Sequence, residues 1–571
     1  MKHFLTVGLA LTLAVAACGD DDAVGPTGTQ PAITAVSPAE GTVGTEVRID
    51  GTGFVDGATV TFGSIESDSV DLEAGALFAF APAGLTAGTT YDIGVVNPGG
   101  KSDQLAAAFT AVAPSAQRVN GVSKPTGLRE MTIIIEGSSF GDALALGGGK
   151  VWFTNTDGTD VEAVIADSAN DWTDGFIVTS VPMGVTDTSY IWVETATGVS
   201  DSIQFRIIQS GTFSPSTINW TRTTALPQAL QGLGAVFVPV EEGSTPANYV
   251  FVVAGADTLT EPTNVVYRAT ILESGALGGA WAVMAALPAA RAYHATAAAT
   301  GYTAALDTTT TAAYVYVIGG QDTAGAAVAD VFVAHVDLAG QVTAWTATTA
   351  LPEALHSARA VLFRGFVYLT GGARADGSPS AKVYRAAVNA DGTLGDWVDL
   401  ATDMPVPAAY HSLLNFGPFL YVVGGDSTTA LPPVQATLSN GELPDVYMAR
   451  VSLRTGELAA PWNSTTFMGK GRSKHSTVFG GGDLFVTSGM YAGVGTTGSS
   501  ENIYGSVASD GTVSAWNGAT GSNTINAVLG INLYNQAAIT FIDAAGEGHV
   551  LVLGGADRAN EGVPSAAVVY Y

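Results

Sequence analysis

The sequence has a single cysteine, Cys18, in 571 residues, so no disulfide can form within one chain. Basic residues are also scarce, with 22 Lys and Arg against 51 Asp and Glu, which gives a formal net charge of −29. An acidic surface of this kind repels nucleic acid and anionic lipid headgroups, so we expect no nucleic-acid partner. General solubility explains the acidity more simply than a cationic partner does. Only 13% of residues are charged while glycine numbers 70, and this composition favours strands and turns over helices.

Motifs for common enzyme chemistry are missing as well. The chain has no nucleophile motif, phosphate-binding loop or spacing of metal ligands. The run from Asp510 to Trp516 is superficially similar to the Asp-box of sialidases. It recurs from Asp391 to Trp397, where a hairpin turn explains it. We therefore predict no cofactor, no metal and no catalytic residue.

The first seventeen residues have the layout of a secretory signal. A basic start at Lys2 and His3 precedes an apolar run over residues 4–14, and small residues follow. The apolar run is too short to remain in a bilayer as a stable anchor. Residues 1–17 are therefore predicted to be a signal peptide.

The segment Val15-Ala16-Ala17-Cys18 ends at the only cysteine. It resembles the bacterial lipobox, whose cysteine is acylated and becomes the mature N-terminus; the alternative is an incidental cysteine beside an ordinary cleavage site. Several acyl chains together anchor a protein firmly. The resemblance implies a cell-envelope lipoprotein attached to the membrane through Cys18. By the same resemblance, Gly19 implies the outer membrane, facing the periplasm or the surface, and residues 18–30 then form a flexible linker.

Short strands with closely spaced turn signals fill residues 31–113. Residues 47–50 and 58–62 alternate between apolar and polar, which predicts a β-sandwich of immunoglobulin type without the cysteine pair of antibody domains. The segment also resembles an IPT/TIG domain in the motifs Ile33-x-x-Val36-Ser37-Pro38, Gly51-x-Gly53-Phe54, Val60-x-Phe62-Gly63 and Asn97-x-Gly99-Gly100-x-Ser102. In that family these residues shape loops and core, so the resemblance implies a fold and no chemistry.

A more diverged copy of this pattern spans residues 114–209. It keeps the order of Gly121-Val122-Ser123, Phe140-Gly141 and Gly198-Val199-Ser200, but inserts residues 142–149 after the glycine-phenylalanine turn. It resembles a second IPT/TIG domain. Tandem sandwiches beside a lipid anchor usually act as spacers for a distal module, although direct ligand binding by them stays open.

A repeat fills the chain from residue 210 to 571, and its clearest unit runs from Leu351 to Trp397. The unit contains two apolar runs (360–363 and 366–372), an alternating stretch (382–388) and an Asp-Gly turn. This pattern predicts a four-stranded antiparallel meander. A single such sheet cannot bury both of its faces, whereas a circular array of copies can.

The copies align on six tryptophans spaced 52 to 65 residues apart: Trp220, Trp281, Trp345, Trp397, Trp462 and Trp516. Each tryptophan is usually followed by Leu-Pro or Met-Pro, then by an apolar strand and an aromatic strand that ends in glycines. These features resemble kelch repeats, whose period is about 50 residues. We therefore expect an all-β chain with two IPT/TIG sandwiches and a six-bladed kelch-type β-propeller.

The two ends of the repeat region are incomplete in complementary ways. The last copy stops after its third strand, and residues 213–220 supply a strand and a tryptophan with no first three strands before them. Pairing the two ends would remove two exposed sheet edges. We therefore expect the strand at 213–220 to close the ring.

Candidate ligand-binding residues come from two positions of the repeat. Three copies have a histidine near the start of the first strand: His294, His411 and His475. In two of these copies an arginine, Arg291 or Arg472, stands three residues before the histidine. A fourth copy has His356 two positions before the equivalent place. One interpretation is a ring of imidazoles and guanidiniums that binds an anionic or sugar ligand. The structural alternative is a hydrogen bond to the neighbouring blade. A metal is disfavoured because histidines of different blades seldom converge at about 2 Å.

The second position is the loop that follows the glycine pair at the end of the aromatic strand, which is Gly371-Gly372 in the clearest unit. Connections in a meander alternate between its two ends, so this loop and the Leu-Pro connection are expected on one face. The loops vary most along the repeat, and recognition usually resides in variable loops on a rigid scaffold. We place the candidate binding surface on this face, with Arg374, Asp426 and Arg558 in the loops and His411 and His475 at its mouth.

The sequence thus predicts a non-catalytic cell-envelope lipoprotein that displays a propeller to a glycan or protein partner. The alternative is a carbohydrate-active enzyme similar to six-bladed kelch sialic-acid mutarotases, although no acid and base pair maps onto that family. Kelch enzymes of the galactose-oxidase type use a cysteine-linked tyrosine at copper. The only cysteine here lies in the lipobox, which excludes that chemistry.

Overall fold

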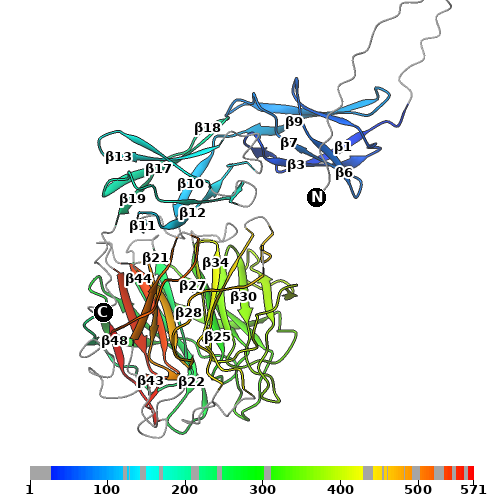
Figure 1. The fold of residues 1–571 in the computed structure, drawn as a ribbon. Helices are drawn as coiled ribbons and strands as arrows, with labels where there is room; N and C mark the ends of the chain where they lie inside the picture. The colour runs from blue at the N-terminus through cyan, green and yellow to red at the C-terminus, as the bar shows by residue number, and fades with distance from the viewer. Residues whose placement is uncertain are drawn as a thin grey trace, which may run out of the picture. The chain divides into compact units, whose positions relative to one another are not determined.

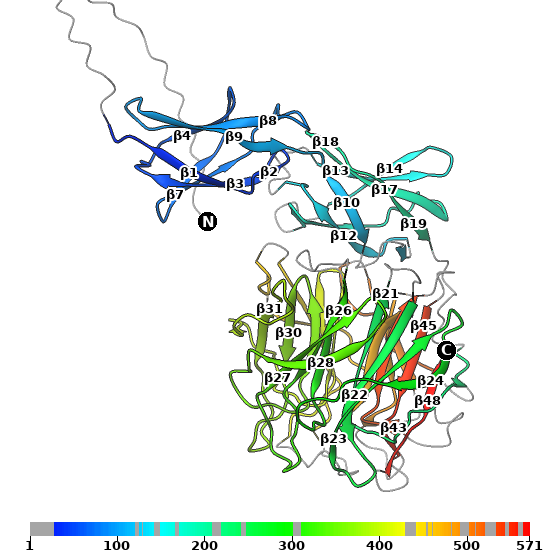
Figure 2. The same cartoon turned by 180° about the vertical axis from the view of Figure 1, so that it is seen from behind.

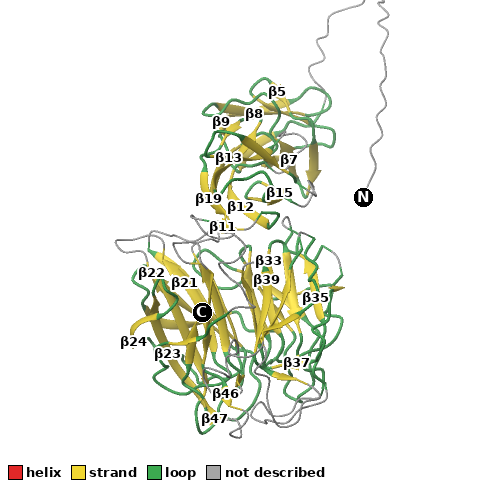
Figure 3. Cartoon of the chain, turned by 60° about the vertical axis from the view of Figure 1, so that its left-hand side comes forward, coloured by secondary structure: helices red, strands yellow, loops and turns green. Residues whose placement is uncertain are grey.

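The computed structural model describes a chain made of strands and loops. The described residues are 28–119, 125–127, 129–141, 149–165, 171–207, 218–240, 247–300, 310–428, 441–452, 455–459, 461–480, 482–491, 502–508, 510–519, 533–542, 548–557 and 563–570. Figure 3 colours these ranges by secondary structure, and they contain no helix. The all-β expectation is therefore confirmed for the part of the chain that the structure describes.

The N-terminal sandwich consists of two antiparallel sheets (Figure 1). The first has the order β1 (Ala32–Ser37), β3 (Glu46–Thr52), β7 (Ala76–Phe80), β6 (Val70–Glu73). The second has the order β2 (Glu40–Gly41), β9 (Ser102–Ala111), β8 (Thr90–Val96), β4 (Thr59–Phe62), β5 (Ile65–Glu66). Alternate residues such as Val47, Ile49 and Val60 are fully buried, as the alternation in the sequence predicts.

The described residues between 115 and 207 form a second pair of sheets. One has the order β10 (Ser115–Val119), β12 (Thr132–Ser138), β16 (Phe176–Ser180), β15 (Trp172–Thr173). The other has the order β11 (Thr126–Gly127), β19 (Ile203–Ile207), β17 (Thr188–Thr195), β13 (Lys150–Asn155), β14 (Asp160–Ala163), and β18 (Gly198–Val199) also pairs with β17. Ile133 and Ile135 of the first sheet share one buried cluster with Phe153 and Ile191 of the second. Most of the predicted insertion, residues 142–148, lies outside the described ranges.

Six four-stranded antiparallel sheets follow (Figures 1 and 2). The first two are β21 (Gly234–Val240), β22 (Ala247–Ala256), β23 (Pro262–Ile271), β24 (Leu277–Val283); and β25 (Ala295–Thr300), β26 (Thr311–Ile318), β27 (Val331–Asp337), β28 (Val342–Thr348). The third and fourth are β29 (Arg359–Phe363), β30 (Phe366–Thr370), β31 (Val383–Ala387), β32 (Val398–Asp399); and β33 (Ser412–Phe416), β34 (Phe419–Val423), β35 (Val446–Arg450), β36 (Asn463–Ser464). The fifth is β38 (Ser476–Gly480), β39 (Asp483–Thr487), β41 (Asn502–Ser506), β42 (Asn517–Ala519).

The sixth sheet combines strands from both ends of the repeat region. Its order is β44 (Ala537–Ile542), β45 (Gly548–Leu553), β48 (Val568–Tyr570), β20 (Thr221–Arg222), with Thr221 opposite Tyr570 and Arg222 opposite Val569. The predicted strand at 213–220 is displaced: the described strand begins directly after Trp220, and residues 213–217 lie outside the described ranges. The pairing itself uses the complementary ends that the sequence analysis identified.

Apolar packing joins each sheet to the next. The first strands contact one another in the cyclic order β21, β25, β29, β33, β38, β44 and back to β21. A buried cluster lies between each neighbouring pair of sheets, and the cluster between the sixth and the first joins Leu551 and Leu553 to Val250 and Val252. Burial of apolar side chains is the main source of stability in such an interface.

Polar side chains at equivalent places add a second set of contacts between sheets. Tyr316, Tyr368 and Tyr421, each on the second strand of its sheet, donate their hydroxyls to the carbonyls of Gly392, Gly456 and Gly511 in the next sheet, at 2.6 to 2.8 Å. The tryptophans form hydrogen bonds to the segment that precedes the first strand of their own sheet. Trp281, Trp345, Trp397 and Trp516 donate their indole N–H to the carbonyls of Thr224, Ala285, Thr349 and Thr466.

Candidate functional site

Six residues at equivalent places before the first strands are joined by backbone hydrogen bonds. We call them the central ring: Gly232, Tyr293, Ser357, Tyr410, Lys474 and Asn535. Each N–H donates to the carbonyl of the preceding member at 2.7 to 3.0 Å, and the N–H of Gly232 donates to the carbonyl of Asn535. Every one of these bonds joins two different sheets, so the six sheets are linked in one cycle.

All six members of the central ring have a left-handed backbone, with φ between 54° and 56°. Five of them are not glycine, and this conformation costs roughly 1–2 kcal/mol for a residue with a Cβ atom. The sixth is glycine for a steric reason: a Cβ atom at Gly232 would lie 2.4 Å from Cε1 of Tyr293. The repeated conformation turns each peptide group so that it can bond to both neighbours.

The three predicted histidines follow members of the central ring directly, and all three are buried. His411 is fully buried, and its Nε2 lies 2.8 Å from the hydroxyl oxygen of Thr370 in the preceding sheet. His294 and His475 are also nearly inaccessible, at 4% and 1% exposure. Burial therefore contradicts the expectation that His411 and His475 stand at the mouth of the binding surface.

Burial also sets the charge state of these histidines. It is the largest cause that lowers the pKa of His294 and His411 to about 3 and that of His475 well below its usual range. The charge of Arg359 lowers all three pKa values further, and Arg291 and Arg472 act on His294 and His475. The three imidazoles are therefore neutral at neutral pH.

The two predicted arginines are buried and already engaged. Arg291 is 3% exposed and forms an ion pair of 2.5 Å with Asp330. Arg472 is 1% exposed and donates from Nη1 to the carbonyl of Ser488 at 2.9 Å. Both contacts link the entry segment of a sheet to the loops that surround it. His356, buried at 5%, packs its ring edge-on against Tyr410 at 6.3 Å.

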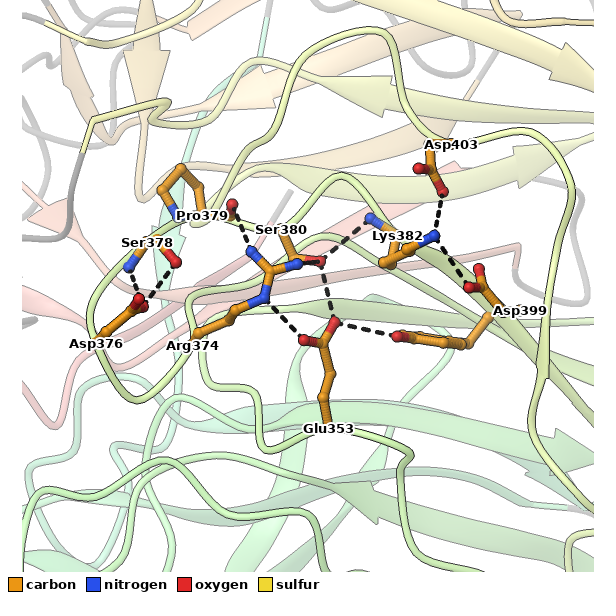
Figure 4. Close-up of polar contacts among 10 residues, drawn as sticks. Glu353, Arg374, Asp376, Ser378, Pro379, Ser380, Lys382, Asp399 and Asp403 are labelled. Carbon is orange, nitrogen blue, oxygen red and sulfur yellow. Dashed lines mark hydrogen bonds and ion pairs between the residues drawn. The ribbon is translucent and has the colours of Figure 1, made fainter.

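Arg374 lies in a polar network (Figure 4). We call the face that carries the loops after the glycine pairs and the Leu-Pro connections the loop face. Its Nε donates to Glu353 at 2.8 Å, and its Nη2 donates to the hydroxyl of Ser380 at 3.1 Å. Glu353 also accepts from Ser380 and from Tyr384. Because Glu353 follows the Leu-Pro connection and Arg374 follows the glycine pair, this ion pair places the two kinds of loop together, as the meander geometry predicts.

Of the two remaining loop candidates, the structure describes Asp426 and not Arg558. Asp426 is 9% exposed, and its carboxylate accepts from the backbone N–H and the hydroxyl of Thr428. This is a local turn that orders the start of the loop. Arg558 and Cys18 lie outside the described residues, so their roles stay predictions.

Sequence reasoning missed two basic residues at the entries of the first strands, Lys474 and Arg359. Lys474 is 4% exposed, and its Nζ lies over the rings of Tyr410 and Tyr534 at 5.1 and 5.8 Å. Arg359, two residues after Ser357, stands where the other sheets have glycine, alanine or serine. A lone basic residue at a position of small residues is the signal that could have identified it.

In the described ranges, no group of three His, Cys, Asp or Glu side chains is placed to hold a metal ion. The same ranges hold no helix that is long and apolar enough to cross a membrane.

The fold and this set of contacts define an all-β protein with an immunoglobulin-like sandwich at its N-terminal side. The IPT/TIG domain family matches residues 31–110, so the chain contains an IPT/TIG domain there. No curated protein matches the chain.

Proposed function

We propose that residues 210–571 form a closed six-bladed β-propeller of the kelch type. The cyclic contacts of the six first strands support closure, and so does the central ring, in which Gly232 of the first sheet bonds to Asn535 of the sixth. The recurring tryptophan and tyrosine contacts support a kelch-like repeat. A ring of this kind leaves only short, protected sheet edges, which favours a stable scaffold.

On this scaffold we base the proposed function, which is binding of a glycan or protein partner without catalysis. The observation that carries it is the contrast between the central ring and the loops. The ring keeps one backbone conformation in six copies, whereas the loops at residues 322–330, 373–382 and 426–445 differ in length and composition. Variable loops on a rigid frame are typical of recognition surfaces.

The ion pair between Glu353 and Arg374 supports one face as the binding surface, because it holds the loop after a glycine pair against the connection between two sheets. Asp426 belongs to the same class of loop. In this proposal the chain is a cell-envelope lipoprotein, attached through Cys18, that presents this loop face to its partner.

The proposal is tested by applying the purified chain to a glycan array and, in parallel, to surface proteins of the same cell envelope. Binding of one glycan class or one protein, with no change in the bound molecule, supports it. Product analysis of each glycan hit tests the catalytic alternative: an anomer-specific conversion would replace the binding function with that of a mutarotase.

A further inference from the structure

Three aromatic residues occupy outward positions on the sheet of β13, β14, β17 and β19 in the second sandwich (Figure 2). They are Trp152 on β13, and Tyr190 and Trp192 on β17; we call them the aromatic face. Their neighbours along the strands, Phe153 and Ile191, are fully buried in the core. Tyr190 is 38% exposed, and both indoles are partly exposed. The outward side of an antiparallel sheet is normally polar, so the three rings break the usual pattern.

The rings of the aromatic face lie together on neighbouring strands. Trp152 is directly opposite Trp192, and their ring centroids are 5.8 Å apart with an interplanar angle of 19°. Tyr190 is opposite Thr154 in the next pair of outward residues. Side chains two residues apart on a strand point to the same side, so the rings of Tyr190 and Trp192 share one surface. Exposed apolar groups that are rimmed by polar residues are typical of interaction sites.

Hydrogen bonds hold both indoles in place. Nε1 of Trp152 donates to Oε2 of Glu194 at 2.7 Å, and Nε1 of Trp192 donates to the hydroxyl of Thr154 at 2.8 Å. The hydroxyl of Thr154 in turn donates to Oδ1 of Asp160 at 2.5 Å. The two rings are therefore ordered before a ligand binds, which lowers the entropic cost of binding.

Carboxylates border the two indoles. Glu162 lies opposite Trp152 on β14, Asp160 stands two residues before it, and Glu194 accepts the indole N–H of Trp152. The cation beside these rings, Lys150, is paired with Glu162 at 3.4 Å, and its Nζ lies 5.2 Å from the centroid of the Trp152 ring. Negative charge is therefore in excess around the indoles, and it repels phosphate, sulfate and uronate groups. Because carboxylates only accept hydrogen bonds, a matching ligand supplies the donors.

Neutral sugars combine the properties that this surface requires. One face of a pyranose ring carries C–H groups that pack on an aromatic ring, and its edge carries hydroxyls that donate to carboxylates. A protein partner is less well suited, because the strongest contacts in protein interfaces come from side chains that fill pockets, whereas these rings lie on the outer side of a sheet. Arg206, opposite Thr188, is two outward rows from Trp192, so the carboxylates are the charges nearest to the indoles.

We propose that the aromatic face binds a neutral glycan. The sugar rings stack on Trp152, Trp192 and Tyr190, and their hydroxyls donate to the carboxylates beside the indoles. This site belongs to the second sandwich and not to the loop face, so it goes beyond the proposed function and does not depend on it. The second sandwich then contributes to recognition in addition to acting as a spacer.

The test titrates the purified full chain with three neutral oligosaccharides: cellohexaose, maltohexaose and fully acetylated chitohexaose. Hexagalacturonate, which carries a carboxylate on every ring, is the anionic comparison. Calorimetry is expected to detect saturable binding of at least one neutral oligosaccharide. Hexagalacturonate is expected to bind at least about tenfold more weakly, because like charges repel at this surface.

Variants locate the binding on the aromatic face. Trp192→Ala is expected to weaken it at least about tenfold, because one of the two stacked rings is lost. Tyr190→Ala removes the most exposed of the three rings and should weaken binding while the thermal midpoint changes little; it carries the test if Trp192→Ala fails to fold. Phe467→Ala, which removes an exposed aromatic ring of the repeat region, is expected to bind as the wild type does.

Unchanged affinity in both Trp192→Ala and Tyr190→Ala, or no saturable binding of any neutral oligosaccharide, would overturn the inference. So would a protein partner that needs the aromatic face when no glycan binds there. A variant with residues 426–440 replaced by a Gly-Ser linker separates this site from the proposed function, because it should keep the binding that Trp192→Ala loses. The opposite pattern would refute the glycan site on the aromatic face and leave the proposed function standing.

Discussion

The backbone N–H of Gly232 donates a hydrogen bond of 2.9 Å to the carbonyl of Asn535. These residues lie at the entries of the first and sixth sheets and are separated by most of the repeat region. Their contact completes a cycle in which each of six left-handed residues bonds to the next. The cycle explains how sheets with different loops keep one common geometry at their centre.

Gly232→Ala should therefore destabilise the chain through the central ring. The new Cβ would have a left-handed backbone, at φ 56°, and would lie 2.4 Å from Cε1 of Tyr293. We expect a loss of about 2–4 kcal/mol in the free energy of unfolding, from conformational strain and overpacking together. Gly325→Ala is the matched control, because its φ is 75° but no atom lies within 4 Å of the added Cβ. Equal losses in the two variants would show that contact with Tyr293 is unimportant.

Much of this architecture could be predicted from the sequence, and the reasons are local. Turn residues and apolar runs repeat in every copy, so the strands around Arg364 and Gly365 were expected, and both residues have the positive φ that the hairpin requires. The tryptophans fixed the period. The central ring could not be predicted in this way, because its members share a backbone conformation and not a residue type.

The candidate site was predicted less well, because the direction of a side chain, like the backbone conformation of the central ring, does not follow from residue type. His411 and His475 were recognised as equivalent, but sequence alone does not give the direction in which a side chain at the entry of a first strand points. Both are buried between sheets. Arg359 belongs to no repeated motif, because the other five sheets have glycine, alanine or serine at its position.

The buried histidines predict a loss of stability in acid. The folded-state pKa of His294 and of His411 is about 3, mainly through burial, against an ordinary value of 6.5. Between these values the unfolded chain binds more protons than the folded chain, so stability decreases as the pH falls below about 6.5. Each histidine contributes a slope of roughly 1 kcal/mol per pH unit in this window.

Urea unfolding at pH 7.5 and pH 5.0 measures this effect. His411→Gln should reduce the difference in free energy of unfolding between the two pH values, and His294→Gln combined with it should reduce the difference further. Carboxylates contribute equally in all three proteins, so the comparison isolates the histidines. An unchanged pH dependence in the double variant would contradict their burial in the neutral form.

A separate prediction concerns the role of the loop face in binding. Residues 426–440 belong to the longest loop after a glycine pair, and residues 429–440 of it lie outside the described ranges. Replacing residues 426–440 with a short Gly-Ser linker should abolish binding to any partner of the loop face, while the thermal midpoint changes little. Asp391→Ala, in the hairpin turn at the other end of a sheet, should leave binding intact. Retained binding in the loop variant would place the site elsewhere.

Membrane attachment is predicted to depend on Cys18, since it is the only cysteine and follows an apolar leader. Cys18→Ser should release the protein from the membrane fraction. Labelling with a palmitate analogue should mark the wild type and not the variant. Equal labelling of both proteins would contradict the lipoprotein hypothesis.

The pairing of the two ends of the repeat region is the contact on which closure most depends. Thr221 lies opposite Tyr570 on neighbouring antiparallel strands. Paired residues of this kind have Cα atoms about 4.5–5.5 Å apart, which suits a disulfide. In a Cys18→Ser background, Thr221→Cys with Tyr570→Cys leaves no other thiol in the chain, so any disulfide reports this pair alone.

The most direct measurement is thiol titration and gel mobility of this double-cysteine protein after mild oxidation. The closed ring predicts a complete intramolecular disulfide and a thermal midpoint several degrees higher, since a long loop is closed. A control pair of Thr221→Cys with Leu259→Cys, whose second site is exposed in a loop of the first sheet, should stay reduced. Free thiols at both 221 and 570 under the same conditions would contradict closure of the six sheets.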